Sequence, residues 1–447
     1  MDWTSLLSSQ RLCQADYKAQ EGRSIFVQDH DRIVFSAPFR RLANKTQVQP
    51  LYEHDHVHHR LIHSIEVGSV GRSLAMQVGQ WLAKRDQIPS DAVHSLADIV
   101  QAACVAHDIG NPPFGHSGEE AMGTWFAERF AAGHGLFADI PAGLRPEFEA
   151  FEGNAQGFRI LTRLEMYRED GGMQLSKATL GAFSKYPVTA AVRATVTGDG
   201  PAPYVGLKKF GVFEAERARF EEVARTLGLP EERAENGSWW RRHPLVFVVE
   251  AADDICYGIV DLEDAFTTGE LSFDTVTGLL AQLCGEIKRD LSTYTQAEVI
   301  AYQRAIGIGK AITACAEAFT ENYEAIMAGT FSRDLVSASR LAPVFAEIKR
   351  VSGQRIFTAQ RKTELEISGR RTIANVMDGI LPVYEDLAAA GWRADRLNGH
   401  SERLIRALDL DLRGVDDAPS ALHALADFTS GMTDRYALRI SRMLSGT

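Results

Sequence analysis

The chain has 447 residues, of which 45% are hydrophobic and 24% are charged, an ordinary composition for a globular protein. The formal net charge of −11 argues against a broad surface that coats nucleic acid, although it is compatible with a local basic groove. No run of about 18 apolar residues occurs, and no basic stretch precedes an apolar one at the N-terminus, so we expect neither a membrane span nor a secretory signal. Five scattered cysteines, odd in number and without a CxxC pair, favour reduced thiols and a cytoplasmic location.

Helical periodicity dominates the chain and strand signals are few, so we expect an all-α fold. In the first predicted helix (about 61–84), apolar residues recur at spacings of three to five. In the third predicted helix (about 244–266), Pro244 suits the first turn. The predicted helices cover about 61–84, 98–109, 244–266, 297–327 and 420–443.

Helix-breaking residues suggest the domain organisation. The sequence Gly110-Asn111-Pro112-Pro113 must end the second helix, because proline lacks an N–H and restricts the residue before it. We divide the chain into an N-terminal segment (1–60) that contributes to a substrate pocket, a catalytic core (61–270) and a helical C-terminal region (271–447). The core holds an inserted region over about 120–240.

A histidine followed directly by an aspartate, His107-Asp108, stands at the end of the second helix. Burying this pair among apolar residues is costly unless its charge is compensated, which a divalent metal would do. His63 in the first helix and Asp253 in the third could join it if the three helices pack together. Such a mixed set suits Mn²⁺, Fe, Zn²⁺ or Mg²⁺. Taken alone, the pair could instead be a loop partner or a cation at a helix end.

The short sequence motifs around these residues, called words below, carry a resemblance to a known family. In order, the words are RRLANKTQV, RLIHSIEV, AHDIGNPPFGHSGE, FEGNAQGFR, KATLGAFSKYP, KKFGVF, EAADDICYGIVDLEDA and SGMTD. The chain resembles the deoxyguanosinetriphosphate triphosphohydrolase (dGTPase) family of the HD-domain phosphohydrolase superfamily, densely over residues 25–266 and sparsely beyond. The resemblance implies an HD-domain helical bundle with a helical insertion and a C-terminal helical extension.

The resemblance also implies roles at a metal centre. His116 and Glu119 would be the catalytic pair beside the phosphates. The implied metal is Mn²⁺ or Mg²⁺ foremost, with Fe, Zn, Co or Ni as alternatives. The implied metal ligands are His63, His107, Asp108 and Asp253.

Further residues would bind substrate. Gln47 and Asp261 match residues that read the sugar 3′-hydroxyl, and Tyr257 matches one packed beneath the deoxyribose, where it would exclude a 2′-hydroxyl. Asn111 would contact the phosphate side. The candidates for the triphosphate are Arg60, Lys185, Lys208 and Lys209.

Helix geometry supports part of this assignment. Asp253, Tyr257 and Asp261 are spaced i, i+4, i+8 and so form one stripe on a helix face. At 1.5 Å per residue the stripe is about 12 Å long, enough to run from a metal-bound phosphate to the far side of a sugar. Arg60 stands one turn before His63 and could reach the same phosphate.

The function implied is hydrolysis of deoxynucleoside triphosphates, dGTP foremost, to a deoxynucleoside and inorganic triphosphate. We expect a homo-oligomer and keep single-stranded DNA as a further partner. One alternative is an HD phosphohydrolase on another nucleotide, such as a phosphodiesterase or 5′-nucleotidase. The other is a nucleotide- or single-stranded-DNA-binding regulator.

Structural explanations compete at several positions. His116 could cap a helix, Glu119 could be a first-turn acid favoured by the helix dipole, and the lysines could be ordinary surface residues. The histidine-rich stretch 53–60 (EHDHVHHR) looks like a second metal site, but it lies outside the words that carry the resemblance, so we disfavour that role. The segment 360–373 could contact the substrate base or a neighbouring subunit.

Overall fold

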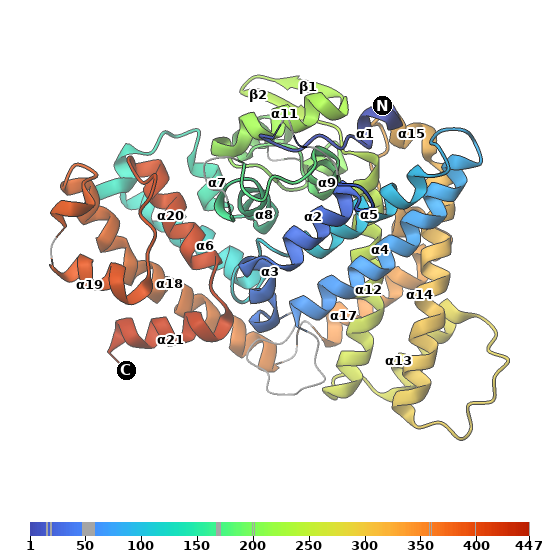
Figure 1. The fold of residues 1–447 in the computed structure, drawn as a ribbon. Helices are drawn as coiled ribbons and strands as arrows, with labels where there is room; N and C mark the ends of the chain where they lie inside the picture. Colours follow the sequence, from blue (N-terminus) through green and yellow to red (C-terminus); the bar gives the residue numbers. More distant parts are fainter. Residues whose placement is uncertain are drawn as a thin grey trace.

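A computed structural model gives the fold shown in Figure 1. It describes residues 1–447 apart from 15–16, 18–19, 47–58, 167–170, 199, 201, 357, 359, 398 and 447. The fold is helical, as predicted, and the strands of the described part form one antiparallel hairpin, β1 (Glu231–Ala234) and β2 (Gly237–Trp240). Within the same residues, none of the helices combines the length and apolar character needed to cross a membrane.

The N-terminal part contains two long helices that carry the predicted site. The elements are α1 (Trp3–Leu6), α2 (Ile25–Val34), α3 (Ala37–Arg41), η1 (Leu42–Asn44), α4 (Arg60–Ala83) and α5 (Ala92–Ala106). α4 agrees with the helix predicted over 61–84. α5 begins earlier than the predicted 98–109 and ends at Ala106, so the His-Asp pair follows the helix rather than lying inside it.

The predicted insertion consists of short elements. They are α6 (His116–Ala132), η2 (Gly135–Asp139), α7 (Arg145–Glu149), α8 (Gly153–Arg159), η3 (Ile160–Leu164), α9 (Lys177–Phe183), α10 (Ala190–Thr197), η4 (Val205–Leu207), η5 (Glu214–Glu216) and α11 (Arg217–Leu227). Most have two turns or fewer, and helices this short are stabilised mainly by tertiary packing.

The remaining helices complete the core and the C-terminal region. They are α12 (Pro244–Thr267), α13 (Phe273–Cys284), α14 (Gln296–Glu321), α15 (Tyr323–Met327), α16 (Leu335–Ala338), α17 (Ala342–Arg355), α18 (Gln360–Ala389), η6 (Ala394–Arg396), α19 (Gly399–Leu408), α20 (Ala418–Ser430) and α21 (Asp434–Ser445). α12 confirms the helix predicted over 244–266, and its first turn carries Pro244 as expected.

Two predicted C-terminal helices are broken in the structure. The segment 297–327 contains α14 and α15, which meet at Asn322. The single helix predicted over 420–443 was wrong, because α20 and α21 are separate. The Thr433 side chain accepts a hydrogen bond from the Tyr436 N–H, and a residue that caps a new helix in this way cannot continue the previous one.

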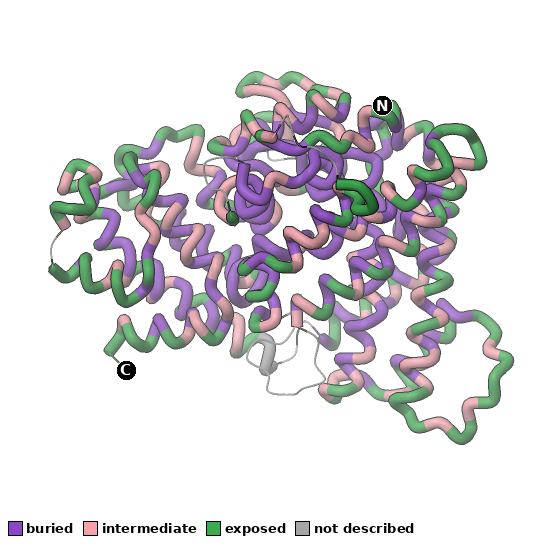
Figure 2. The backbone as a smooth tube through the Cα atoms, viewed as in Figure 1, coloured by how far each residue is buried: buried purple, intermediate pink, exposed green. Residues whose placement is uncertain are grey.

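Close packing of three helices positions the site. α4 packs against both α5 and α12, and Figure 2 shows that this central part of the chain is largely buried. The approach depends on small residues: a Cβ added at Gly71 would lie 2.4 Å from the Sγ atom of Cys104 in α5. The ends of α4 and α5 are thereby held beside the middle of α12.

The C-terminal helices form a separate group. Figure 1 shows α18 to α21 gathered at one end of the molecule, beside α6, while α13 and α14 lie at the other end. The long α18 packs against α6, α20 and α21. The C-terminal region therefore covers the helix that starts with His116.

Replacing Gly71 by alanine should lower the free energy of unfolding by about 1–3 kcal/mol, because the added methyl group overpacks the contact with Cys104. Gly309 in the exposed part of α14 has no atom within 4 Å of an added Cβ, so Gly309→Ala is the matched control. It should raise stability by about 0.5–1 kcal/mol through helix propensity alone. Urea unfolding of both variants measures the difference, and equal effects would argue against the packing constraint.

Candidate metal centre and substrate cavity

Three helices bring the four predicted metal ligands together. The His63 Nε2 atom lies 3.1 Å from the Oδ1 atom of Asp253. The His107 Nε2 atom lies 3.6 Å from the same oxygen and 3.5 Å from the Oδ1 atom of Asp108. Ligand atoms of His63, His107 and Asp108 all lie within 4.8 Å of one another. Two imidazole nitrogens and two carboxylates thus converge, a donor set that fits a divalent cation.

Local geometry orients His107 for this role. The residue follows the last turn of α5, where its Nδ1 atom lies 2.7 Å from the carbonyl oxygen of Cys104. Because a carbonyl only accepts, Nδ1 carries a proton, and Nε2 is the ring nitrogen that faces the carboxylates. The backbone therefore sets the tautomer that a metal ligand requires.

The two carboxylates are stabilised in their charged form by basic neighbours. Burial alone would raise their pKa values. The Arg60 guanidinium, whose NH1 atom donates to Asp108 over 2.6 Å, acts with His107 against burial and lowers the pKa of Asp108 to about 2. For Asp253, His107 and His63 outweigh burial and hold the pKa well below its usual range. Both groups are therefore anions at neutral pH.

His116 and Glu119 form a second unit at the start of α6. The Nδ1 atom of His116 lies 2.7 Å from Oε2 of Glu119, and this hydrogen bond raises the pKa of the imidazole. The His116 side chain is 83% exposed, whereas that of Glu119 is 9% exposed. The other oxygen of Glu119 accepts the N–H of Gly153 over 2.8 Å. A buried, fixed carboxylate therefore holds an accessible imidazole.

Both units face one cavity of about 410 Å³. His107, Asp108, Asp253 and His116 line it, and His63 lies buried beside Asp253. The other lining residues are Thr46, Arg60, Asn111, Phe114, Gly115, Ser117, Asn154, Ala182, Phe183, Lys185, Tyr186, Lys209, Val246, Val249, Glu250, Asp254, Tyr257 and Glu366.

Known proteins resemble this chain over its whole length. The HD domain family matches residues 60–142. A deoxyguanosinetriphosphate triphosphohydrolase-like protein of Pseudomonas aeruginosa is 41% identical over 466 residues, covering 100% of this chain and 99% of the relative. A protein of the same name from Synechocystis is 39% identical over 450 residues, with 100% and 99% covered. The chain belongs to the dGTPase-like family of HD-domain phosphohydrolases.

A more distant relative carries the shorter name. A deoxyguanosinetriphosphate triphosphohydrolase of Yersinia pestis is 32% identical over 517 residues, covering 98% of this chain and 97% of the relative. These relatives are aligned with this chain over nearly the full length of both partners, and the predicted HD-domain resemblance is confirmed.

In this dGTPase-like chain, four of the five predicted phosphate contacts line the cavity, and Lys208 does not. Lys185 and Lys209 line the cavity, and each has an acidic neighbour: Lys185 Nζ lies 3.3 Å from Glu250, and Lys209 Nζ lies 2.8 Å from Glu152. Lys208 is exposed and is absent from the cavity lining. Arg60 and Asn111 line the cavity and also contact Asp108.

The predicted sugar contacts are brought together only in part. Tyr257 lines the cavity with 40% of its surface exposed. Asp261, one turn further along α12, is buried and does not line it. Gln47 lies outside the described residues, although its neighbour Thr46 reaches the cavity.

The histidine-rich stretch lies largely outside the described residues, which include only its last two positions. His59 is the N-cap of α4, and its ring accepts the N–H of Ile62 over 3.4 Å. It is not among the residues that line the cavity.

Several residues that line the cavity were not predicted from the sequence. Asn154 and Tyr186 belong to words that carried the resemblance, so a signal existed without an assigned role. Asp254 follows the predicted metal ligand Asp253, and burial raises the pKa of Asp254 to about 8. Glu366 lies in α18, within the segment 360–373 that we expected to contact either the substrate base or a neighbouring subunit. No local pattern distinguishes Glu366 from other helical acids.

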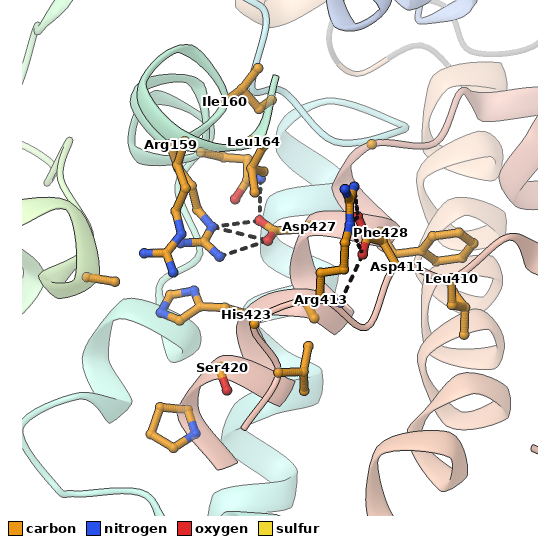
Figure 3. Close-up of a pocket in the computed structure, with 18 of the residues that line it drawn as sticks. Arg159, Ile160, Leu164, Leu410, Asp411, Arg413, Ser420, His423, Asp427 and Phe428 are labelled. Atoms are coloured by element: carbon orange, nitrogen blue, oxygen red, sulfur yellow. Dashed lines mark hydrogen bonds and ion pairs between the residues drawn. The ribbon is translucent and has the colours of Figure 1, made fainter. Parts of the chain in front are cut away.

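A larger cavity of about 750 Å³ lies elsewhere, where α20 and the segment after α19 face α8 and η3 (Figure 3). It contains none of the four predicted ligands. Two of its arginines pair with lining aspartates: Arg159 binds Asp427 over 2.9 Å, and Arg413 binds Asp411 over 2.7 Å. The larger of these two cavities is therefore not the one that holds the predicted ligands.

Replacing His63 by alanine should weaken Mn²⁺ binding by at least tenfold, because one of the four donors is lost. His94, which is exposed on α5, gives the matched control His94→Ala with unchanged affinity. Isothermal titration of the metal-free proteins measures both. Equal Mn²⁺ affinity in the two variants would show that the four residues do not bind the metal.

Proposed function

We propose that this protein hydrolyses deoxynucleoside triphosphates, dGTP foremost, releasing a deoxynucleoside and inorganic triphosphate. The observation that carries the proposal is the convergence of two histidines and two aspartates beside the His116–Glu119 pair in one cavity. The names of the full-length relatives support the choice of substrate. His63, His107, Asp108 and Asp253 would hold a divalent cation, Mn²⁺ or Mg²⁺ foremost, which supplies Lewis-acid activation of water and phosphate.

The His116–Glu119 pair is suited to proton transfer. With Nδ1–H donating to Glu119, the Nε2 atom is left to take a proton from the attacking water or to give one to the leaving oxygen at the α-phosphate. Because Glu119 is itself fixed by the Gly153 N–H, the imidazole keeps this tautomer. Lys185, Lys209 and Arg60 would stabilise charge on the phosphate oxygens.

The α12 face would select the sugar. Asp253 and Tyr257 both line the cavity and stand one helical turn apart. A deoxyribose could pack on the Tyr257 ring, whereas a 2′-hydroxyl would need extra room and a polar partner there. We propose Gln47 and Asp261 for the 3′-hydroxyl. Homo-oligomer formation and single-stranded DNA binding stay predictions.

Glu366 is the acidic side chain that α18 contributes to the cavity, and we propose it as a contact to the base. A carboxylate can accept two hydrogen bonds from the N1–H and N2–H groups of guanine. Adenine and the pyrimidines do not offer the same pair of donors. This contact would therefore favour dGTP.

Product analysis tests the reaction. The Mn²⁺-loaded protein should release triphosphate from dNTPs, and His116→Ala should lower kcat by about 10²–10⁴-fold through the loss of proton transfer. His134→Ala, at an exposed histidine away from the cavity, is the control. Release of monophosphate from a phosphodiester, or of phosphate from a nucleoside monophosphate, in place of triphosphate would favour the other HD phosphohydrolase activities.

Substrate competition tests the base contact. Glu366→Gln should lower kcat/KM for dGTP relative to dATP by about tenfold, because the amide cannot accept both guanine donors. Glu364→Gln, at an exposed position on the same helix, should leave the ratio unchanged. An unchanged ratio in Glu366→Gln would remove Glu366 from base selection.

A further inference from the structure

A buried carboxylate from the C-terminal helices contacts the catalytic body at two places. Asp434 is the first residue of α21 and is 1% exposed. Its Oδ1 atom accepts the N–H of Phe114 over 3.0 Å. Its Oδ2 atom accepts the N–H of Thr46 over 3.0 Å and the Thr46 hydroxyl over 2.6 Å. One side chain therefore joins the segment after His107-Asp108 to the segment that precedes Gln47.

A buried lysine makes a parallel connection. The Nζ atom of Lys45 donates to the carbonyl oxygen of Asn111 over 2.7 Å and to that of Ser430 over 2.8 Å. The carbonyl of Lys45 accepts the N–H of Arg60, the first residue of α4, over 3.1 Å. Lys45 thus ties the loop after Asp108 to both α4 and the end of α20. Breaking either end would leave a buried polar group without its partner, at a cost of about 1–3 kcal/mol.

The loop 107–116, which these hydrogen bonds hold, contains an unfavourable backbone conformation at Phe114. Phe114 has φ of +64° and Gly115 has φ of +59°, and a left-handed conformation is costly for a bulky residue. Such a conformation persists only where neighbouring contacts hold it. The Phe114 ring packs on Gly369 of α18, where an added Cβ would lie 2.8 Å from Cγ, and its N–H is bonded to Asp434. Both restraints come from the C-terminal helices.

The loop in question carries the groups that the reaction needs. It begins at His107 and Asp108, passes Asn111 and ends at His116, all of which line the cavity. Neither Asp434 nor Lys45 lines the cavity, so neither would touch substrate. A shift of the loop by even 1 Å would misalign the metal ligands with the imidazole, and misplacement on that scale can cost about 10²-fold in rate.

We propose that Asp434 and Lys45 are positioning residues that hold the loop 107–116 in its productive conformation, so that turnover depends on the C-terminal helices. The inference rests on the proposed function, since it assigns the loop a part in that reaction. It predicts a larger effect on kcat than on substrate affinity, because the loop carries His107, Asp108 and His116. Lys185, Lys209 and Tyr257, which would bind substrate, are attached to other segments.

Asp434→Asn is the direct test, because the amide can no longer accept from both Phe114 and Thr46. Asp427→Asn is the matched control: Asp427 also joins a C-terminal helix to the body, through Arg159, but does not contact the loop. On the best substrate of the wild type, Asp434→Asn should lower kcat at least tenfold more than Asp427→Asn does, and should change KM by a smaller factor than kcat. A similar kcat in the two variants, measured where circular dichroism shows both folded, would overturn the proposal.

Hydrogen exchange separates this inference from the proposed function. Amides of residues 107–116 should exchange at least tenfold faster in Asp434→Asn than in the wild type, and at the wild-type rate in Asp427→Asn. This readout needs no substrate, so an inactive wild type would contradict the proposed function while exchange still tests the restraint. Lys45→Met, which removes the ammonium group, serves if Asp434→Asn does not fold. Unchanged exchange over 107–116 in the folded variant would refute the positioning role.

Discussion

The structure depends on keeping two carboxylates charged at the contact of three tightly packed helices. Burial disfavours the charged form of Asp108 and Asp253, yet Arg60, His63 and His107 more than offset it. These partners are effective only at short distance, which requires α4 to lie against α5 and α12. The small residues along α4 serve that approach, so helix packing and site electrostatics are one constraint rather than two.

Buried polar contacts join the C-terminal helices to the body in addition to apolar packing. Arg159 bonds to both Asp427 and Glu216, and His423 lies 3.0 Å from Glu147. Buried polar networks of this kind have strict geometric demands, because each unpaired member is costly. They therefore fix one arrangement of α20 and α21 against the body. A purely apolar contact would allow these helices to shift along the surface they pack on. The loop 107–116, which lines the cavity, contacts the C-terminal helices, so its position is fixed with them.

Local signals in the sequence located the central features and missed those that depend on distant contacts. α4 and α12 were predictable because one face of each repeats apolar residues, and the His-Asp pair stood out at the end of an apolar helix. Most helices between His116 and Leu227 have too few turns to establish a periodic pattern, and Pro382 within α18 is normally a helix breaker. Glu366 was not distinguishable in sequence because it reaches the cavity only through the docking of α18.

The lysines of the cavity are neutralised by the protein itself. Lys185 lies beside Glu250, and Lys209 beside Glu152. Under the proposed function, an arriving phosphate would exchange one anionic neighbour for another at each ammonium group, and its net electrostatic gain would be smaller than at an unopposed cation. Inorganic phosphate has no further groups with which to recover the difference. A nucleotide also has a sugar and a base, so under the proposed function retention in this cavity would depend on contacts to the whole molecule and not on its charge alone.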